Sequence, residues 1–198
     1  ATVLFVCLRN AGRSQMSRAL FDCASSGRHR GLSAGSIADP AGEIHPQVVA
    51  AMDEVGVDLR GVRPRRLTPE LADQADVIVT MGCGDACPYI PGRRYLDWDL
   101  PDPAGRPLDE VRAIRDDIAD RVQDLVRQLV NQEILRSSAA LCQLRGASRP
   151  PYRQREVADE LSELLRLSFG SSGAFGFDSL LREGLKLDHH QLAVLRRI

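Results

Sequence analysis

The chain has 198 residues, 43% of them hydrophobic, and a formal net charge of −1 at pH 7, which suits one compact domain with a small appendage. A charge so close to zero creates no global field that would select nucleic acid or an anionic membrane, so we expect neither as a partner. No apolar run approaches the roughly 20 residues that span a bilayer. The apolar start over residues 2–6 is too short for a secretory signal, so we expect a cytoplasmic protein.

Short apolar runs alternate with amphipathic segments over the first part of the chain. We expect strands over residues 2–6, 32–36, 76–81 and 94–98. We expect helices over residues 14–24, 46–55 (ended by Gly56), 68–70 onward (begun by Thr68 and Pro69) and 108–130. Strands that alternate with helices predict an α/β fold with a parallel sheet covered on both sides. Ligands of such sheets bind beyond the carboxyl ends of the strands.

The sequence changes character after about residue 131, where Pro150-Pro151 marks a break between further short helical patterns. We therefore predict two parts, a domain over residues 1–132 and a helical C-terminal extension over residues 133–198. Three roles are open for the extension: a dimerisation element that would make a homodimer, a docking surface, or a regulatory module.

The five cysteines are an odd number, which in a reducing compartment favours reactive thiols over a structural disulfide framework. We expect Cys23 and Cys142 to be buried bystanders. The basic residues are also skewed, because Lys186 is the only lysine among 26 basic residues. Since arginine has GC-rich codons, this bias indicates a GC-rich genome.

The strongest chemical signal directly follows the first apolar run. It consists of Cys7, Leu8, Arg9, Asn10, Ala11, Gly12, Arg13 and Ser14. A loop between a strand and a helix can turn its backbone N–H groups inward around a tetrahedral oxyanion. Arg13 would hold two oxygens of that anion, and the Cys7 thiolate would lie beneath it as a nucleophile. The alternative is a buried cysteine at a strand end and a solvated arginine on a helix.

A second signal is a pair of cysteines, Cys83 and Cys87, in a Gly/Asp-containing segment. This spacing allows a reducible disulfide or half of a metal site. Zinc needs about four ligands, and no histidine or further cysteine stands at ligand spacing, so we expect no metal. Two unrelated loop cysteines are the remaining alternative.

A third signal is Asp102, which lies between Pro101 and Pro103. Transfer of an oxyanion to a cysteine needs a proton donor for the departing oxygen, and Asp102 on this rigid loop suits that role. Asp97 and Asp99 are rivals without flanking prolines. The alternative for Asp102 is an ordinary turn residue.

These motifs resemble the low-molecular-weight tyrosine phosphatase superfamily, through Cys7-x5-Arg13-Ser14 and the later Asp102-Pro103. The arsenate reductase branch is more similar, because Gln15 stands where the phosphatases usually have proline. Four further segments fit this branch: residues 33–36, 44–46, 56–59 and 81–85. The resemblance covers residues 2 to about 130 and implies a four-stranded parallel sheet with flanking helices.

The resemblance also implies a mechanism. Cys7 attacks arsenate held by the loop amides and Arg13, and Asp102 protonates the leaving hydroxyl. Cys83 then attacks Cys7 and releases arsenite, and Cys87 attacks Cys83, so that the disulfide moves outward to thioredoxin. Ser14 is expected to hydrogen-bond the thiolate, and Asn10 to brace the loop.

Two departures from the resemblance matter. Cys83 and Cys87 are closer together than the pair in the best-known thioredoxin-coupled members. A second branch, from GC-rich actinobacteria, uses mycothiol as the attacking thiol and mycoredoxin to finish the cycle. Two cysteines in one segment favour the internal relay, and no bound cofactor is expected in either case. The second departure is Arg18, which stands where some reductases have a glutamate that helps to hold potassium, so we expect no potassium site.

Two other functions compete with arsenate reduction. A low-molecular-weight protein tyrosine phosphatase would hydrolyse phosphomonoesters through a Cys7 phosphoenzyme. It should need an aromatic rim around the site, for which Tyr89, Tyr95 and Trp98 are the nearby residues. A non-enzymatic oxyanion or redox sensor would signal through the C-terminal extension.

Overall fold

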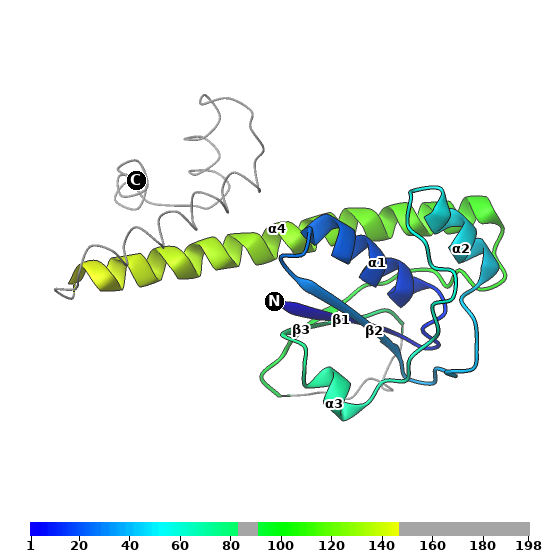
Figure 1. Ribbon diagram of the computed structural model, residues 1–198, viewed down its shortest axis with the longest axis horizontal. Helices are drawn as coiled ribbons and strands as arrows, with labels where there is room; N and C mark the ends of the chain where they lie inside the picture. Colours follow the sequence, from blue (N-terminus) through cyan, green and yellow to red (C-terminus); the bar gives the residue numbers. More distant parts are fainter. Residues whose placement is uncertain (83–90, 147–198) are drawn as a thin grey trace, which may run out of the picture. The chain divides into compact units, whose positions relative to one another are not determined.

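The computed structural model describes residues 1–82 and 91–146 (Figure 1). The chain divides into two compact units, Ala1–Val126 and Arg127–Ile198. Most of the predicted site lies in the first unit, to which the following description refers. The predicted boundary between residues 132 and 133 stays a prediction.

Four parallel strands form one sheet, in the order β2-β1-β3-β4. The strands are β1 (Thr2–Cys7), β2 (Arg30–Gly35), β3 (Val77–Thr80) and β4 (Arg94–Asp97). The helices are α1 (Arg13–Ser25), α2 (Pro46–Asp53), α3 (Pro69–Ala72) and α4 (Leu108–Gly146). The predicted four-stranded α/β fold is confirmed. Because β1 lies inside the sheet, Cys7 at its end is flanked by the ends of β2 and β3.

The sheet is covered on both faces, with α3 on one side and α1 and α4 on the other (Figure 1). Successive side chains of β1 point to opposite faces. Leu4 and Val6 pack with Leu71 and Ala72 of α3. On the other face, the ring of Phe5 lies 5.5 Å from that of Phe21 in α1. Because both faces of β1 are buried, polar residues do not alternate with apolar residues along this strand.

Helix α4 covers its face of the sheet with a stripe of apolar side chains at helical spacing. Those buried in the first unit are Val111, Ile114, Ile118, Val122 and Leu125. The helix was predicted to end near residue 130 but continues to Gly146. Neither glycine nor proline occurs between Leu108 and Gly146, so the change in composition after residue 131 does not interrupt the helix. Among the described residues, no helix is long and apolar enough to cross a membrane.

The prediction that Cys23 is buried is wrong, because this cysteine is exposed on α1. The sequence pattern groups Met16, Ala19, Leu20 and Cys23 on one apolar face of the helix. The helix instead buries Ser17 and Phe21, one turn apart, with Met16 and Ala19 beside them. Phe21 is the larger apolar group, and its burial against Phe5 turns Cys23 toward solvent. Cys142 lies among residues whose side chains are not described.

Candidate active site

The loop predicted to bind an oxyanion joins the end of β1 to the start of α1. Cys7 is the last residue of the strand, and Arg13 is the first of the helix. The carbonyl of Gly12 accepts the first hydrogen bonds of α1, from the N–H groups of Gln15 and Met16. Within the described part of the chain, six backbone N–H groups of this loop have no protein acceptor: those of Leu8, Arg9, Ala11, Gly12, Arg13 and Ser14. They are available to an anion at the helix N-terminus.

The sulfur of Cys7 is buried and contacts two hydrogen-bonding groups. The backbone N–H of Asn10 donates to it at 3.2 Å, and the hydroxyl of Ser14 lies 3.0 Å away. The side-chain amide of Asn10 also donates to the Ser14 oxygen at 2.8 Å. In the contact between Cys7 and Ser14, either the hydroxyl or the thiol can be the donor. The buried sulfur is thus held by the Asn10 N–H and by the Ser14 hydroxyl group.

Asn10 holds the loop in its curved shape. Its φ is +54°, a left-handed conformation that asparagine tolerates better than most residues. Its side-chain oxygen accepts hydrogen bonds from Gln15 Nε2 at 2.9 Å and from the backbone N–H of Arg65 at 2.8 Å. One buried side chain thus joins the loop, the first turn of α1 and the segment before α3. This geometry agrees with the bracing role expected for Asn10.

Arg13 connects the loop to the segment after β4. Its guanidinium is buried, donates from Nη1 to the carbonyl of Leu100 at 2.9 Å, and lies 3.2 Å from Asp102 Oδ2 through Nη2. The Asp102 side chain is 54% exposed, so it reaches both Arg13 and solvent. Pro103 packs over the loop so closely that a Cβ on Gly12 would lie 2.6 Å from Pro103 Cγ. Asp102 therefore lies beside the loop between Cys7 and Arg13, and its role as a proton donor stays a prediction.

The two rival aspartates have other contacts. Asp97 accepts a hydrogen bond from Thr80 Oγ1 at the ends of β3 and β4. The backbone carbonyl of Asp99 accepts a hydrogen bond from Arg121 of α4. Of the three candidates, Asp102 alone forms an ion pair with Arg13 among the described residues.

The chain after β3 also reaches Arg13. The backbone N–H of Met81 donates to the carbonyl of Val6. The hydrogen bonding between β1 and the chain after β3 thus continues as far as the site. A Cβ on Gly82, whose φ is +67°, would lie 3.1 Å from Arg13 Nη1. Gly82 therefore lies directly against the guanidinium. Cys83 and Cys87 lie outside the described residues, and their roles stay predictions.

Three contacts of this site were not predicted from the sequence: the Leu100 carbonyl, the Arg65 N–H and the packing of Pro103 on Gly12. Each uses a backbone group or a generic ring, so no residue type signals it in advance. Gln15 was noted only as a family marker. It positions Asn10 and also contacts the carbonyl of Arg63 at 3.4 Å.

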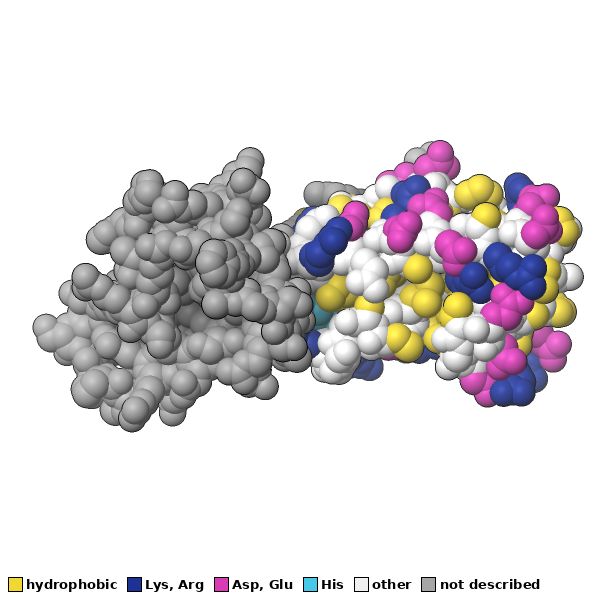
Figure 2. Space-filling model, turned by 90° about the horizontal axis from the view of Figure 1, so that it is seen from above, with side chains coloured by type: hydrophobic (Ala, Val, Ile, Leu, Met, Phe, Trp, Pro, Cys, Tyr) yellow, Lys and Arg dark blue, Asp and Glu magenta, His cyan; other side chains and the backbone are white. Residues whose placement is uncertain are grey.

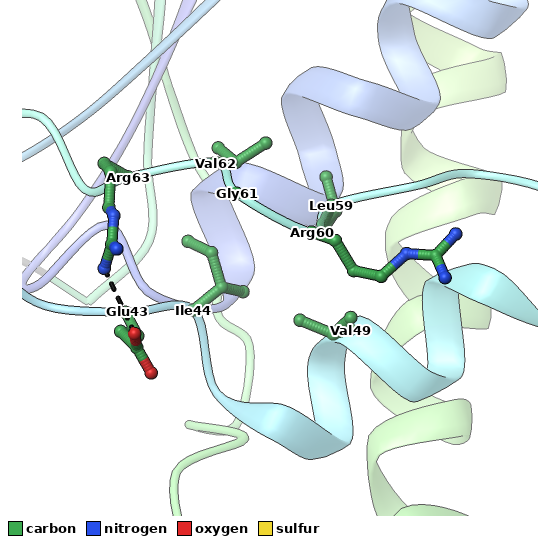
Figure 3. A pocket seen from close by; sticks show the side chains of 8 residues that line it. All are labelled: Glu43, Ile44, Val49, Leu59, Arg60, Gly61, Val62 and Arg63. Carbon is green, nitrogen blue, oxygen red and sulfur yellow. Dashed lines mark hydrogen bonds and ion pairs between the residues drawn. The ribbon is translucent and has the colours of Figure 1, made fainter.

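A cavity of about 190 Å³ lies between residues 59–63 on one side and α2 with the two residues Glu43 and Ile44 before it on the other (Figure 3). Its lining residues are Glu43, Ile44, Val49, Leu59, Arg60, Gly61, Val62 and Arg63. None of these is a predicted site residue. The two arginines at its rim are already paired, Arg60 with Asp58 at 2.8 Å and Arg63 with Glu43 at 3.2 Å. The described residues contain no group of three or more metal-ligating side chains, and Arg18 pairs with Asp22 at 3.1 Å.

Comparison with known proteins agrees with this geometry. The family model for low molecular weight phosphotyrosine protein phosphatase matches residues 2–135. A candidate arsenate reductase of Halobacterium salinarum is 39% identical over 124 residues, or 61% of this chain and 87% of that protein. A glutaredoxin arsenate reductase of Synechocystis is 32% identical over 130 residues, covering 64% of this chain and 97% of that protein.

A solved structure is similar as well, that of a thioredoxin-dependent arsenate reductase of Corynebacterium glutamicum. Its TM-score is 0.54 at 38% identity, and the match covers 64% of this chain. This chain spans 60% of the length of the Corynebacterium chain. Since the family model matches more than half of the 198 residues, the chain belongs to the low molecular weight phosphotyrosine protein phosphatase family.

Proposed function

We propose that this protein reduces arsenate to arsenite through a covalent adduct on Cys7 and a thiol relay through Cys83 and Cys87. The observation that carries the proposal is the contact of Gly82 with the Arg13 guanidinium. Cys83 directly follows Gly82 in the sequence. A second thiol that can attack the adduct distinguishes a reductase from a hydrolase. The names of the similar proteins support the same activity.

In the first step, the Cys7 thiolate attacks the arsenic atom of HAsO₄²⁻ and displaces its hydroxyl group. The unpaired loop N–H groups and Arg13 hold the remaining oxygens. Asp102 supplies the proton, so the hydroxyl leaves as water and Cys7–S–AsO₃²⁻ remains. Ser14 and the Asn10 N–H, which both contact the sulfur of Cys7, keep it beneath the oxyanion.

In the second step, the Cys83 thiolate attacks the sulfur of Cys7. The S–As bond breaks with its electron pair left on arsenic, which changes from As(V) to As(III) and leaves as arsenite. The two sulfurs lose these electrons and form a Cys7–Cys83 disulfide. Cys87 then attacks Cys83, which frees the Cys7 thiolate for another cycle. The resulting Cys83–Cys87 disulfide needs an external dithiol.

We propose thioredoxin as that dithiol. The Corynebacterium relative is named for thioredoxin and the Synechocystis relative for glutaredoxin, so the reductant varies among similar proteins. An adduct resolved by mycothiol and mycoredoxin would need neither Cys83 nor Cys87. The presence of both cysteines within the five residues that follow Gly82 in the sequence favours the internal relay.

A phosphatase would use the same Cys7, Arg13 and Asp102. The aromatic side chains that would rim a phosphotyrosine site serve the core instead. Trp98 is buried, with its ring 5.8 Å from that of Phe5, and Tyr95 packs against the core beside α3. Tyr89 lies outside the described residues. The described aromatic residues therefore do not favour this alternative.

A single-turnover experiment tests the proposal. Fully reduced protein is mixed with excess arsenate without any external thiol, and arsenite, remaining thiols and disulfides are measured. We expect one arsenite and two lost thiols per chain, with peptide mapping that finds a Cys83–Cys87 link. No arsenite and full retention of thiols would contradict the relay. Adding mycothiol to the same sample would then separate an external-thiol reductase from a phosphatase.

A further inference from the structure

Three exposed arginines lie beside the nucleophile loop and outside the oxyanion cradle. Arg9 is on the loop itself, and Arg65 and Arg66 are on the segment before α3. All three side chains are exposed, and none forms an ion pair with any residue that the structure describes. We call Arg9, Arg65 and Arg66 the arginine rim.

Gly35, the last residue of β2, fixes the spacing of the rim. Its backbone N–H donates to the carbonyl of Arg65 at 2.8 Å, and its carbonyl accepts from Leu67. On its other side, a Cβ at Gly35 would lie 2.8 Å from the carbonyl carbon of Arg9. Gly35 is therefore sandwiched between the two stretches that carry the rim arginines. Together with the bond from the Arg65 N–H to Asn10, these contacts join the rim rigidly to the loop.

Six other arginines in the first unit, exposed or half-buried, are paired with a nearby carboxylate. The pairs are Arg18–Asp22, Arg60–Asp58, Arg63–Glu43, Arg106–Glu110, Arg112–Glu54 and Arg121–Asp117. Figure 2 shows such a face, on which basic and acidic side chains alternate. With a net charge of −1 for the whole chain, three unpaired arginines beside one loop are a local concentration of positive charge.

The rim is not needed to bind arsenate. Six loop N–H groups and the buried Arg13 already offer at least one donor for each oxygen of a tetrahedral anion. The rim side chains point into solvent outside this cradle. They suit a ligand larger than the oxyanion, with several negative charges spread over its surface.

The position of the arginine rim at the carboxyl ends of the strands indicates what that ligand is. In the strand order β2-β1-β3, the rim lies on the β2 side of Cys7 and Gly82 on the β3 side. Neighbouring strands are about 4.8 Å apart. The arginine rim and Gly82 therefore lie near each other at the carboxyl ends of the strands. An interface of about 800 Å² per partner would cover both. A protein that comes to reduce a Cys83–Cys87 disulfide would therefore also touch the rim.

From these observations we propose that the arginine rim is a docking surface for an acidic face of the redox protein that reduces this enzyme. The proposal rests on the relay described under Proposed function. Complementary charge raises the rate of encounter between two proteins and orients them, so the rim speeds disulfide reduction without a role in arsenate chemistry.

The test measures reduction of a preformed disulfide, so it needs no arsenate. The full chain is oxidised with diamide, and the Cys83–Cys87 link is verified by peptide mapping. Reduced thioredoxin with an acidic surface is the probe. The rate at which it reduces the disulfide is measured by stopped flow at about 20 mM and about 500 mM NaCl. The test variant is Arg65→Gln/Arg66→Gln, which leaves Arg9 and the cradle unchanged.

The matched control is Arg30→Glu, which changes the net charge by the same amount. Arg30 is exposed at the first residue of β2, whereas Gly35 is at the last, roughly 16 Å along the strand at 3.3 Å per residue. Dithiothreitol is the second control, because it reduces the disulfide without any charged surface.

At low salt, we expect the second-order rate constant with thioredoxin to fall about three- to tenfold in the double variant, and much less in Arg30→Glu. The difference should vanish at high salt, and the dithiothreitol rate should not change. An unchanged thioredoxin rate, an equal loss with dithiothreitol, or no reaction of the wild-type disulfide with thioredoxin would each overturn the proposal.

Single-turnover release of arsenite by the reduced chain distinguishes failure of the docking proposal from failure of the proposed reductase function. An equal loss there in the double variant would show that the rim serves the oxyanion, and this too would overturn the docking proposal. If wild-type protein releases no arsenite, the proposed reductase function fails, while the thioredoxin reaction still tests docking.

Discussion

Nη2 of Arg13 lies 3.2 Å from Oδ2 of Asp102, so the Asp102 carboxylate is paired with the guanidinium that a bound oxyanion would contact. The pair is asymmetric, because the arginine side chain is 8% exposed and the aspartate side chain 54% exposed. The buried partner is also fixed by the Leu100 carbonyl. The aspartate is therefore the member of the pair that is free to move when an anion binds.

Replacing Asp102 with asparagine should have opposite effects on binding and on chemistry. Asp102→Asn removes a negative charge that competes with the anion for Arg13, so phosphate, as an arsenate mimic, should bind several-fold more tightly. Loss of the proton donor should slow single-turnover release of arsenite by about 10²–10⁴-fold. Calorimetry with phosphate and rapid quench with arsenate measure the two effects. Weaker phosphate binding in the variant would contradict this account of the ion pair.

Gly12 is expected to be indispensable for the position of Asp102. In Gly12→Ala, the new methyl group would meet Pro103 Cγ at 2.6 Å, which no real Cβ contact allows, so the segment with Asp102 must move away. We expect slower arsenite release with little change in thiolate formation at Cys7. Rates of alkylation by iodoacetamide provide that second measurement. A variant with wild-type turnover would show that Asp102 need not stay over the loop.

The relay predicts a sharp difference between two cysteine variants. Cys83→Ser should abolish multiple turnover with thioredoxin, because the arsenic adduct on Cys7 then lacks its internal attacking thiol. Cys23→Ser is the matched control, since Cys23 is exposed on α1 and is no part of the loop. It should retain wild-type turnover. Normal turnover of Cys83→Ser with thioredoxin would disprove the internal relay.

The sequence predicts the fold well because its strands are buried on both faces. A continuous apolar run such as residues 3–6 leaves few alternatives to a central parallel strand, and the structure places it between β2 and β3. The oxyanion loop is equally predictable, because the cysteine and the arginine at its two ends have distinctive chemistry. Asp102 is found through its flanking prolines.

Other features could not be predicted, for physical reasons that differ. The side of α1 that is buried depends on the contact of Phe21 with Phe5, a tertiary contact between distant parts of the chain. The length of α4 depends on the absence of glycine and proline, which the change in composition concealed. The contacts that hold Arg13 and Asn10 use the Leu100 carbonyl and the Arg65 N–H, which every residue type possesses.

Asn10 should contribute both through its backbone and through its side chain, and two variants separate these effects. Asn10→Ala is disfavoured at a φ of +54° and also leaves the half-buried Arg65 N–H without its acceptor. We expect a loss of roughly 2–4 kcal/mol in the free energy of unfolding. Asn10→Gly relieves the backbone strain and should recover about 1 kcal/mol of that loss. Urea unfolding measures both, and equal stabilities would mean that the left-handed backbone costs nothing here.

Glu54 at the end of α2 should make part of the stability dependent on pH. A side-chain hydrogen bond from Arg112 of α4 is the largest cause that lowers the pKa of Glu54 below its usual value of 4.5, and Arg115 acts in the same direction. A lowered pKa in the folded state means that the pair stabilises the protein above the unfolded pKa. The stabilisation is lost as the pH falls through the folded pKa.

We therefore expect Glu54→Gln to be less stable than wild type at neutral pH, and the difference in stability to shrink when the pH is lowered to 3. The difference should be small, because the glutamate is exposed. Asp120→Asn is the control, since Asp120 is exposed on α4 and forms no ion pair within the described residues. Urea midpoints at both pH values provide the measurement. A Glu54→Gln deficit that persists unchanged at pH 3 would show that the side chain acts through packing and not through its charge.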